Sequence, residues 1–221
     1  MKPYFFHSKS KVIPSINISH IEQLQPRIDW CNKHSERVHL DICDGKFVKN
    51  LTPSLSQLLS GEYKSWADVH LMVQNPLKMI KSESELIKIN TVYFHKESEP
   101  NCLDLINFCH YHKINAGIAL SLGSSVSSIK SFLSIIDCVL ILTVNLGQTG
   151  GQFDKSSLIK IRELREIGFG GKIIVDGAIT NLSIKEVKTF NPDGIISGNY
   201  IFADLNISSD RYLELDQILT N

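Results

Sequence analysis

Short runs rich in apolar and β-branched residues alternate along this chain with longer stretches in which apolar residues recur at helical spacing. The predicted strands are Val12–Ile16, Arg37–Asp41, Ala67–Met72, Thr91–His95, Asn115–Leu120, Cys138–Thr143, Lys172–Asp176 and Gly194–Ser197. The predicted helices are Ile18–Lys33, Ser54–Leu59, Pro76–Asn90, Cys102–Lys113, Val126–Ile135, Ser156–Ile167, Ser183–Phe190 and Asp210–Leu219. The pattern therefore predicts eight consecutive strand–helix units.

Eight such units in 221 residues predict the α/β class and a single (β/α)8 TIM barrel over residues 1–221. A doubly wound open sheet is the alternative, because its units look the same in sequence. However, no G-x-G-x-x-G follows Val12–Ile16, where a dinucleotide site would require one. No low-complexity segment, charge block or long linker divides the chain, which favours one domain.

Two helix boundaries carry local signals. Asn75 stands before Pro76, which predicts a capping side chain followed by a proline at the first helical position. Gly168 follows the helix Ser156–Ile167, where a glycine favours helix termination.

Composition narrows the class of protein. With 43% hydrophobic and 21% charged residues, the chain can bury a large core and does not resemble a disordered protein. The 23 basic residues balance 23 acidic ones, which argues against nucleic acid or a membrane surface as the main partner. The first residues contain no apolar run long enough for a signal peptide, and we expect a cytoplasmic protein. Five cysteines without a C-x-x-C pair argue against a disulfide scaffold or a four-cysteine zinc site.

Reactive side chains gather at the predicted carboxyl ends of strands, the end at which barrels place their chemistry. His39 and Asp41 are two residues apart, so they point to the same face of their strand. His70 belongs to the next strand, and Asp176 ends the seventh. Two imidazoles and two carboxylates that converge in this way predict a site for a divalent cation such as Zn²⁺, Fe²⁺, Mn²⁺ or Co²⁺.

Glycines follow the last three predicted strands, in the loops where such barrels commonly bind phosphate. Glycine lets backbone N–H groups approach an anion closely. The candidate phosphate-binding residues are Gly150, Gly151, Gly177, Gly198 and Asn199.

Several motifs resemble those of ribulose-phosphate 3-epimerases, in order along nearly the whole chain. Residues 39–50, HLDICDGKFVKN, resemble the family pattern H-x-D-x-M-D-G-x-F-V-P-N. Residues 68–76, DVHLMVQNP, resemble D-x-H-L-M-V-x-x-P, and residues 94–97, FHKE, are similar to F-H-x-E. Residues 117–123, 143–152, 175–177 and 197–202 resemble the family's later glycine-containing motifs.

The resemblance implies a barrel of the ribulose-phosphate-binding type that epimerises a ketose phosphate at C3. It implies that His39, Asp41, His70 and Asp176 bind the metal and that Asp41 and Asp176 are the catalytic acid and base. It also implies that Ser15 and His70 contact the substrate. Inversion at C3 requires a proton to leave one face of an enediolate and another to arrive on the opposite face, for which two opposed carboxyl groups are suited. The family further implies a homo-oligomer.

The sequence departs from the family around this site. Cys43 and Leu142 stand at positions where the family has methionines, and Ala178 replaces a glycine. Leu146 replaces a proline, in a loop with one extra residue before Gly150. These changes leave the four strand-end residues intact and alter the surrounding walls.

The leading functional hypothesis is a metal-dependent epimerase that interconverts D-ribulose 5-phosphate and D-xylulose 5-phosphate. A 3-epimerase for a hexulose 6-phosphate, such as D-allulose 6-phosphate, is the alternative that the altered phosphate loop motivates. A lyase of the decarboxylase and hexulose-phosphate synthase type would resemble D-x-K-x-x-D, whereas residues 41–44 read DICD without the lysine. A non-catalytic sugar-phosphate binding protein would need neither opposed carboxylates nor a metal. His95 and Glu97 could orient a ligand or serve the structure.

Overall fold

A computed structural model of the chain describes residues 10–18, 20–83, 86–147 and 151–220. Eight parallel strands form a closed barrel in the order β1 to β8, each paired with the next and β8 paired with β1. The strands are β1 (Val12–Ile16), β2 (Arg37–Cys43), β3 (Trp66–Met72), β4 (Ile89–Phe94), β5 (Asn115–Leu120), β6 (Cys138–Leu142), β7 (Lys172–Asp176) and β8 (Gly194–Ser197). The predicted (β/α)8 barrel is confirmed, and the open sheet is wrong.

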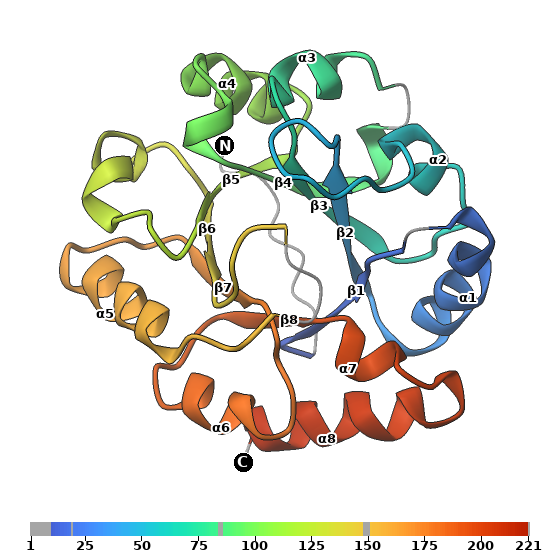
Figure 1. The fold of residues 1–221 in the computed structure, drawn as a ribbon. Helices are drawn as coiled ribbons and strands as arrows, with labels where there is room; N and C mark the ends of the chain where they lie inside the picture. The colour runs from blue at the N-terminus through green and yellow to red at the C-terminus, as the bar shows by residue number, and fades with distance from the viewer. Residues whose placement is uncertain (1–9, 19, 84–85, 148–150, 221) are drawn as a thin grey trace.

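Helices surround the strands as an outer ring (Figure 1). The α-helices are α1 (Leu24–His34), α2 (Leu55–Leu59), α3 (Pro76–Lys81), α4 (Cys102–Tyr111), α5 (Ile159–Glu166), α6 (Ser183–Lys188), α7 (Asn199–Phe202) and α8 (Ser208–Thr220). Short 3-10 helices are η1 (Ile21–Gln23), η2 (Leu86–Lys88), η3 (Lys96–Ser98), η4 (Val126–Phe132), η5 (Lys155–Leu158) and η6 (Leu205–Ile207). None of the helices in the described part of the chain is long and apolar enough to cross a membrane.

The helices predicted over Ile18–Lys33 and Ser156–Ile167 each begin with a 3-10 helix, η1 and η5. Two other predicted helices differ more clearly in extent or type. The helix predicted over Pro76–Asn90 ends at Lys81, because Ser82 bonds back to the Met79 carbonyl and the apolar pattern beyond it includes the exposed Ile87. The segment predicted as a helix at Val126–Ile135 is the 3-10 helix η4. Its serines bond to one another and to nearby carbonyls, which competes with an α-helix.

Of the two predicted helix boundaries, the capping role of Asn75 is wrong and the helix end before Gly168 is confirmed. Pro76 does occupy the start of α3, but Asn75 adopts a left-handed conformation and its side chain makes no capping bond. Glu99 takes over this role, because its Oε2 accepts the Leu77 N–H at 2.8 Å. At α5 the prediction is confirmed: the helix ends at Glu166, and Gly168 follows with a φ of 81°.

Side-chain alternation along the strands separates two apolar layers. Residues such as Leu40, Val69 and Ile118 point outward and pack under the helices. A second cluster fills the barrel itself and consists of Ile13, Tyr93, Ala119, Cys138, Leu140, Leu142, Ile174 and Ile196. Gly117 on β5 provides space for this filling, because a Cβ there would lie 2.5 Å from the Tyr93 ring. The barrel formed by the described residues is therefore a packed core, with a cavity at its carboxyl end.

Candidate active site

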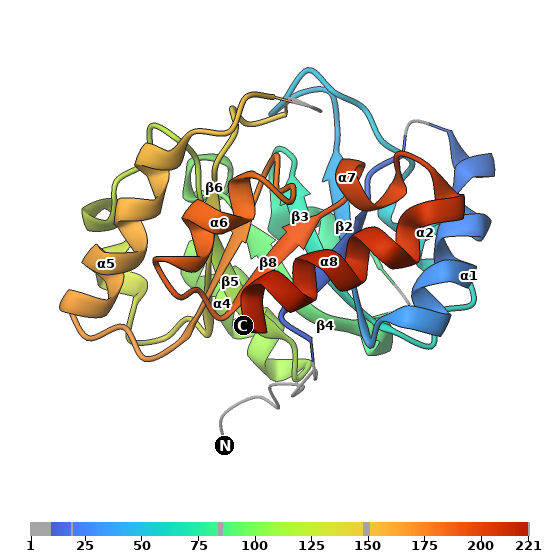
Figure 2. The same cartoon turned by 90° about the horizontal axis from the view of Figure 1, so that it is seen from below.

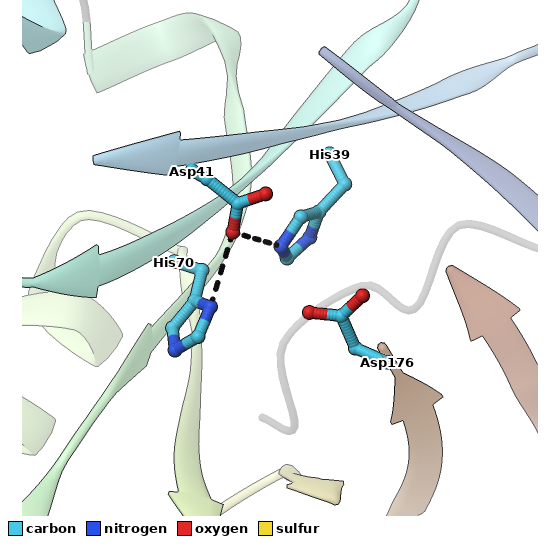
Figure 3. Close-up of side chains that lie close together, drawn as sticks. All are labelled: His39, Asp41, His70 and Asp176. Atoms are coloured by element: carbon cyan, nitrogen blue, oxygen red, sulfur yellow. Dashed lines mark hydrogen bonds and ion pairs between the residues drawn. The ribbon is translucent and has the colours of Figure 1, made fainter. Parts of the chain in front are cut away.

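The strand pairing brings the predicted metal ligands together at the carboxyl end of the barrel. Asp41 lies beside His70 in the β2–β3 register, and His39 lies one alternate position earlier on the same face of β2. Asp176 ends β7 and points toward them from across the barrel (Figure 3). One ligand atom from each of His39, Asp41, His70 and Asp176 lies within 4.8 Å of the others.

Asp41 is the centre of this cluster. Its Oδ1 lies 3.3 Å from His39 Nε2 and 3.2 Å from His70 Nδ1. Its Oδ2 accepts a hydrogen bond from Ser15 Oγ at 3.0 Å. The carboxylate is buried, and so are both imidazoles. Ser15, which the resemblance assigns to the substrate, thus holds the central carboxylate and also lines the cavity beside it.

The two carboxyl groups differ in their affinity for a proton. Burial opposes a charge on Asp41, but His39 and His70 outweigh it and hold the pKa of Asp41 well below its ordinary value. Burial, followed by the negative charge of Asp41, raises the pKa of Asp176 to about 7. One carboxyl group is therefore ionised near neutral pH while the other can carry a proton, as an acid–base pair requires.

The imidazoles are poised to ligate. In the described part of the chain, neither ring nitrogen of the fully buried His39 has a hydrogen-bond partner of good geometry. A buried polar atom without a partner is costly, and a ligand at the site would satisfy it. Imidazole nitrogens and carboxylate oxygens are donors that Zn²⁺, Fe²⁺ and Mn²⁺ accept. The cluster can therefore hold a divalent metal ion.

A cavity of about 380 Å³ opens over the cluster. Its lining includes Ser15, Asp41, His70 and Asp176, and it reaches the loops after β7 and β8 through Gly177, Gly198 and Asn199. Figure 2 shows the loops that follow β2 and β6 rising at the same end of the molecule, where α7 also lies. The cavity thus has a reactive side at the strand ends and a glycine-rich side.

The loop after β7 depends on its backbone conformation. Gly177 has a φ of 115°, which an L side chain rarely adopts, and a Cβ there would lie 2.7 Å from Val144. Thr143 Oγ1 donates to the Gly177 carbonyl and fixes the loop against β6. Ala178, which replaces a family glycine, also takes a left-handed conformation with a φ of 49°. An alanine in this conformation carries a cost in backbone strain that a glycine would not.

An apolar wall closes another side of the cavity. Cys43, Val48 and Met72 form a buried cluster, against which Phe47 and Leu146 pack. Burial, and then the charges of Asp41 and Asp44, raise the pKa of the Cys43 thiol to about 12. Cys43 therefore remains a protonated thiol and serves as a small apolar side chain.

The remaining predicted residues have different positions. Gly151 does not line the cavity, and Gly150 lies outside the described residues. Glu97 is exposed and accepts a hydrogen bond from Ser124, so it lies away from the cluster. His95 is buried, and its Nε2 lies 2.9 Å from His70 Nε2.

Sequence reasoning missed several polar residues of the cavity. These are Asn17, Asn50, Thr52 and Asn145. Asn17 follows Ser15 at the spacing of one strand face, which is a signal that could have identified it. The others lie in the loops after β2 and β6 and carry no such spacing.

The closed barrel, the carboxyl groups that face each other at its strand ends and the glycine-rich loops define an α/β-barrel enzyme of the kind that acts on small molecules at this end. Residues 11–202 match the Ribulose-phosphate 3 epimerase family. The chain belongs to this family and is an epimerase, a member of the isomerases.

Curated relatives agree with this assignment. The chain is 31% identical to the ribulose-phosphate 3-epimerase of Treponema pallidum (strain Nichols), over 86% of this chain and 90% of the relative. It is 33% identical to that of Buchnera aphidicola subsp. Baizongia pistaciae, over 80% and 82%. It is 28% identical to the chloroplastic ribulose-5-phosphate-3-epimerase of Arabidopsis thaliana, over 88% and 73%.

Solved structures support the fold. A 3-hexulose-6-phosphate synthase superposes with a TM-score of 0.72 at 11% identity, over 95% of this chain and 99% of that one. The tryptophan synthase of M. tuberculosis superposes with a TM-score of 0.66 at 7% identity, over 95% and 93%. At such low identity the likeness concerns the barrel alone.

Proposed function

We propose that this epimerase interconverts D-ribulose 5-phosphate and D-xylulose 5-phosphate with Asp41 and Asp176 as its acid and base. The observation that carries the proposal is the pair of carboxyl groups at the ends of β2 and β7, which face one cavity and differ in pKa. One carboxyl group removes the C3 proton, and the electron pair moves toward the C2 carbonyl oxygen. The other returns a proton to C3 from the opposite face, which inverts the centre.

We further propose that His39, Asp41, His70 and Asp176 hold one divalent metal ion, which we take to be Zn²⁺, Fe²⁺, Mn²⁺ or Co²⁺. When bound, such an ion supplies Lewis-acid stabilisation of the negative charge that develops on oxygen. Ser15 Oγ orients Asp41 by donating a hydrogen bond to its Oδ2, so that Oδ1 is directed at the two histidines.

The phosphate end of the substrate belongs on the glycine-rich side of the cavity. Gly177, Gly198 and Asn199 line it there, and their backbone N–H groups are the donors we assign to the phosphate oxygens. Gly150 and Gly151 remain candidates of the sequence for the same role. A homo-oligomer and a cytoplasmic location likewise remain predictions.

A hexulose 6-phosphate is the second candidate substrate. Cys43 and Leu142 both line the cavity; a cysteine is smaller than the methionine it replaces, and a leucine is shorter and branched, so both change the shape of the wall. A six-carbon ketose phosphate would lie against this wall and use the same two carboxyl groups.

A coupled epimerase assay tests the proposal. Metal-loaded wild type and Asp176→Asn would be given D-ribulose 5-phosphate and, in parallel, D-allulose 6-phosphate. We expect turnover of the pentulose phosphate, with incorporation of solvent deuterium at C3, and its loss in the variant. Turnover of the hexulose phosphate alone would transfer the proposal to that substrate. If a folded, metal-loaded protein exchanged deuterium into neither compound, the proposed reaction would be wrong.

A further inference from the structure

His95 lies directly behind one of the proposed metal ligands. It follows β4 and is fully buried, and its Nε2 lies 2.9 Å from His70 Nε2. His70 lines the cavity, whereas His95 does not. The backbone of His95 is fixed, because its carbonyl accepts hydrogen bonds from both the N–H and the hydroxyl of Ser98. The polar contact of His95 with the cluster is therefore made to His70, while its ring also lies 5.4 Å from the ring of Phe47, measured between centroids.

The contact between the two imidazoles admits a single proton. Two N–H groups at 2.9 Å would repel each other, and so would two lone pairs. A neutral imidazole carries one proton, on one of its two ring nitrogens. One Nε2 must therefore donate to the other, and the choice determines where the remaining proton of each ring lies.

The other nitrogen of His70 faces the candidate metal centre. Its Nδ1 lies 3.2 Å from Asp41 Oδ1. If Nδ1 carries the proton, it donates to Asp41, and Nε2 must accept from His95. If Nδ1 is to offer a lone pair to a cation, the proton must reside on Nε2, and His95 must accept it.

We infer that His95 is a positioning residue that accepts the Nε2–H of His70 and so keeps the Nδ1 lone pair directed at the cation. The inference rests on the metal site proposed above and concerns how this chain prepares it. His95 Nδ1, which has no hydrogen-bond partner in the described part of the chain, then carries the proton of that ring. Cation binding reverses the direction of the His70–His95 hydrogen bond.

Cobalt(II) titration of the metal-free protein tests this role without an activity assay. His95→Leu removes the acceptor while it keeps a buried side chain of similar size, and His95→Gln offers a carboxamide oxygen in its place. We expect His95→Leu to bind cobalt about 10- to 100-fold more weakly than wild type, and His95→Gln to recover most of this loss. His110→Leu is the matched control, because His110 is hydrogen-bonded to Asp137 and lies outside the cavity lining. It should bind cobalt like wild type.

The cobalt titration distinguishes a failure of the proposed metal site from a failure of the proposed role of His95. If wild type failed to bind cobalt, the metal site itself would be wrong, and the inference would fall with it. If wild type and His95→Leu bound cobalt equally, with the same visible spectrum, the metal site would stand and the role of His95 would be refuted.

A measurement on wild type avoids any folding defect in the variants. Nitrogen-15 NMR of histidine-labelled protein distinguishes the two tautomers of each ring. In the zinc-loaded protein we expect protons on His70 Nε2 and His95 Nδ1, and in the metal-free protein protons on His70 Nδ1 and His95 Nε2. A proton on His95 Nε2 in the zinc-loaded protein would contradict the inference.

Discussion

On β2 and β3 the two ends of the barrel carry similar side chains, and these side chains have different partners. At the amino end, Asp68 receives Arg37 Nε at 3.0 Å and Asn90 Nδ2 at 2.7 Å, and the guanidinium Nη2 adds a second contact. Asn115 in turn donates to the Asn90 carbonyl. Both carboxylate oxygens of this buried group have donors from the protein itself.

At the carboxyl end, two residues further along β2 and β3, the buried carboxylate has different partners. Asp41 shares one oxygen between two imidazoles, and across the barrel it faces Asp176, a second carboxyl group. No guanidinium joins this cluster of described side chains, and it lies under an open cavity. The comparison teaches that the charged groups at the amino end are paired within the protein and so stabilise the fold. The charged groups at the carboxyl end face the cavity, where a ligand can bind them.

The largest expected effect is the loss of activity in Asp41→Asn. The amide cannot accept the C3 proton, so we expect kcat/KM to fall by about 10³- to 10⁴-fold, as measured in the coupled assay. The fold should persist, because the amide retains the contact with Ser15. A variant that kept more than a tenth of the wild-type rate would remove Asp41 from the chemistry.

The matching substitution at the other end should act on stability instead. Asp68→Asn leaves the partly buried Arg37 without its negative partner, and we expect the free energy of unfolding to fall by about 3 kcal/mol. Urea unfolding measures this loss. The folded fraction should keep a kcat within about threefold of wild type. A large loss of kcat with unchanged stability would abolish the distinction between the two ends.

The carboxyl end should also carry a stability cost that depends on pH. Because the folded pKa of Asp176 is raised from 3.8 to about 7, folding favours its protonated form, and this contribution is lost as pH rises toward 7. In the metal-free protein we expect Asp176→Asn to be more stable than wild type by about 1–2 kcal/mol at pH 8.

The same gain should shrink as pH falls and approach zero at about pH 3, below the unfolded pKa of 3.8, where Asp176 is protonated in both the folded and the unfolded protein. Urea unfolding of both metal-free proteins at the two pH values measures the difference. Equal stability at pH 8 would show that neither burial nor the charge of Asp41 raises the pKa of Asp176 in the folded protein.

The smallest effect belongs to Ser15. Ser15→Ala removes one hydrogen bond from Asp41 Oδ2 and leaves the histidine contacts in place. We expect kcat/KM to fall by about 3- to 10-fold, measured beside wild type at saturating metal. A loss as large as that of Asp41→Asn would instead give Ser15 a direct role in the reaction.

The sequence predicted the strands and the four strand-end residues because both depend on local spacing. His39 and Asp41 share a face by the two-residue period of a strand, whatever the rest of the chain does. Parallel strands of a barrel then bring His70 and Asp176 to the same end. The family motifs identified the same residues.

Other features depend on contacts that no local pattern records. The hydrogen bond from Ser15 to Asp41 follows from the β1–β2 register, in which Ser15 pairs with His39. Asn50 and Thr52 reach the cavity because the loop after β2 folds back, with a bridge between Asp44 and Leu51. Helix α7 spans only Asn199–Phe202, which is too short to show a period.

Because the interior of the barrel is filled with side chains, the active-site cavity is closed at its inner end. Below Asp41 and Asp176, buried side chains such as Tyr93 and Leu140 close the axis, so a sugar phosphate turns back through the mouth by which it came. The product therefore leaves by the same opening through which the next substrate molecule enters, so the product must dissociate first. Each epimer should therefore compete with the other for the free enzyme.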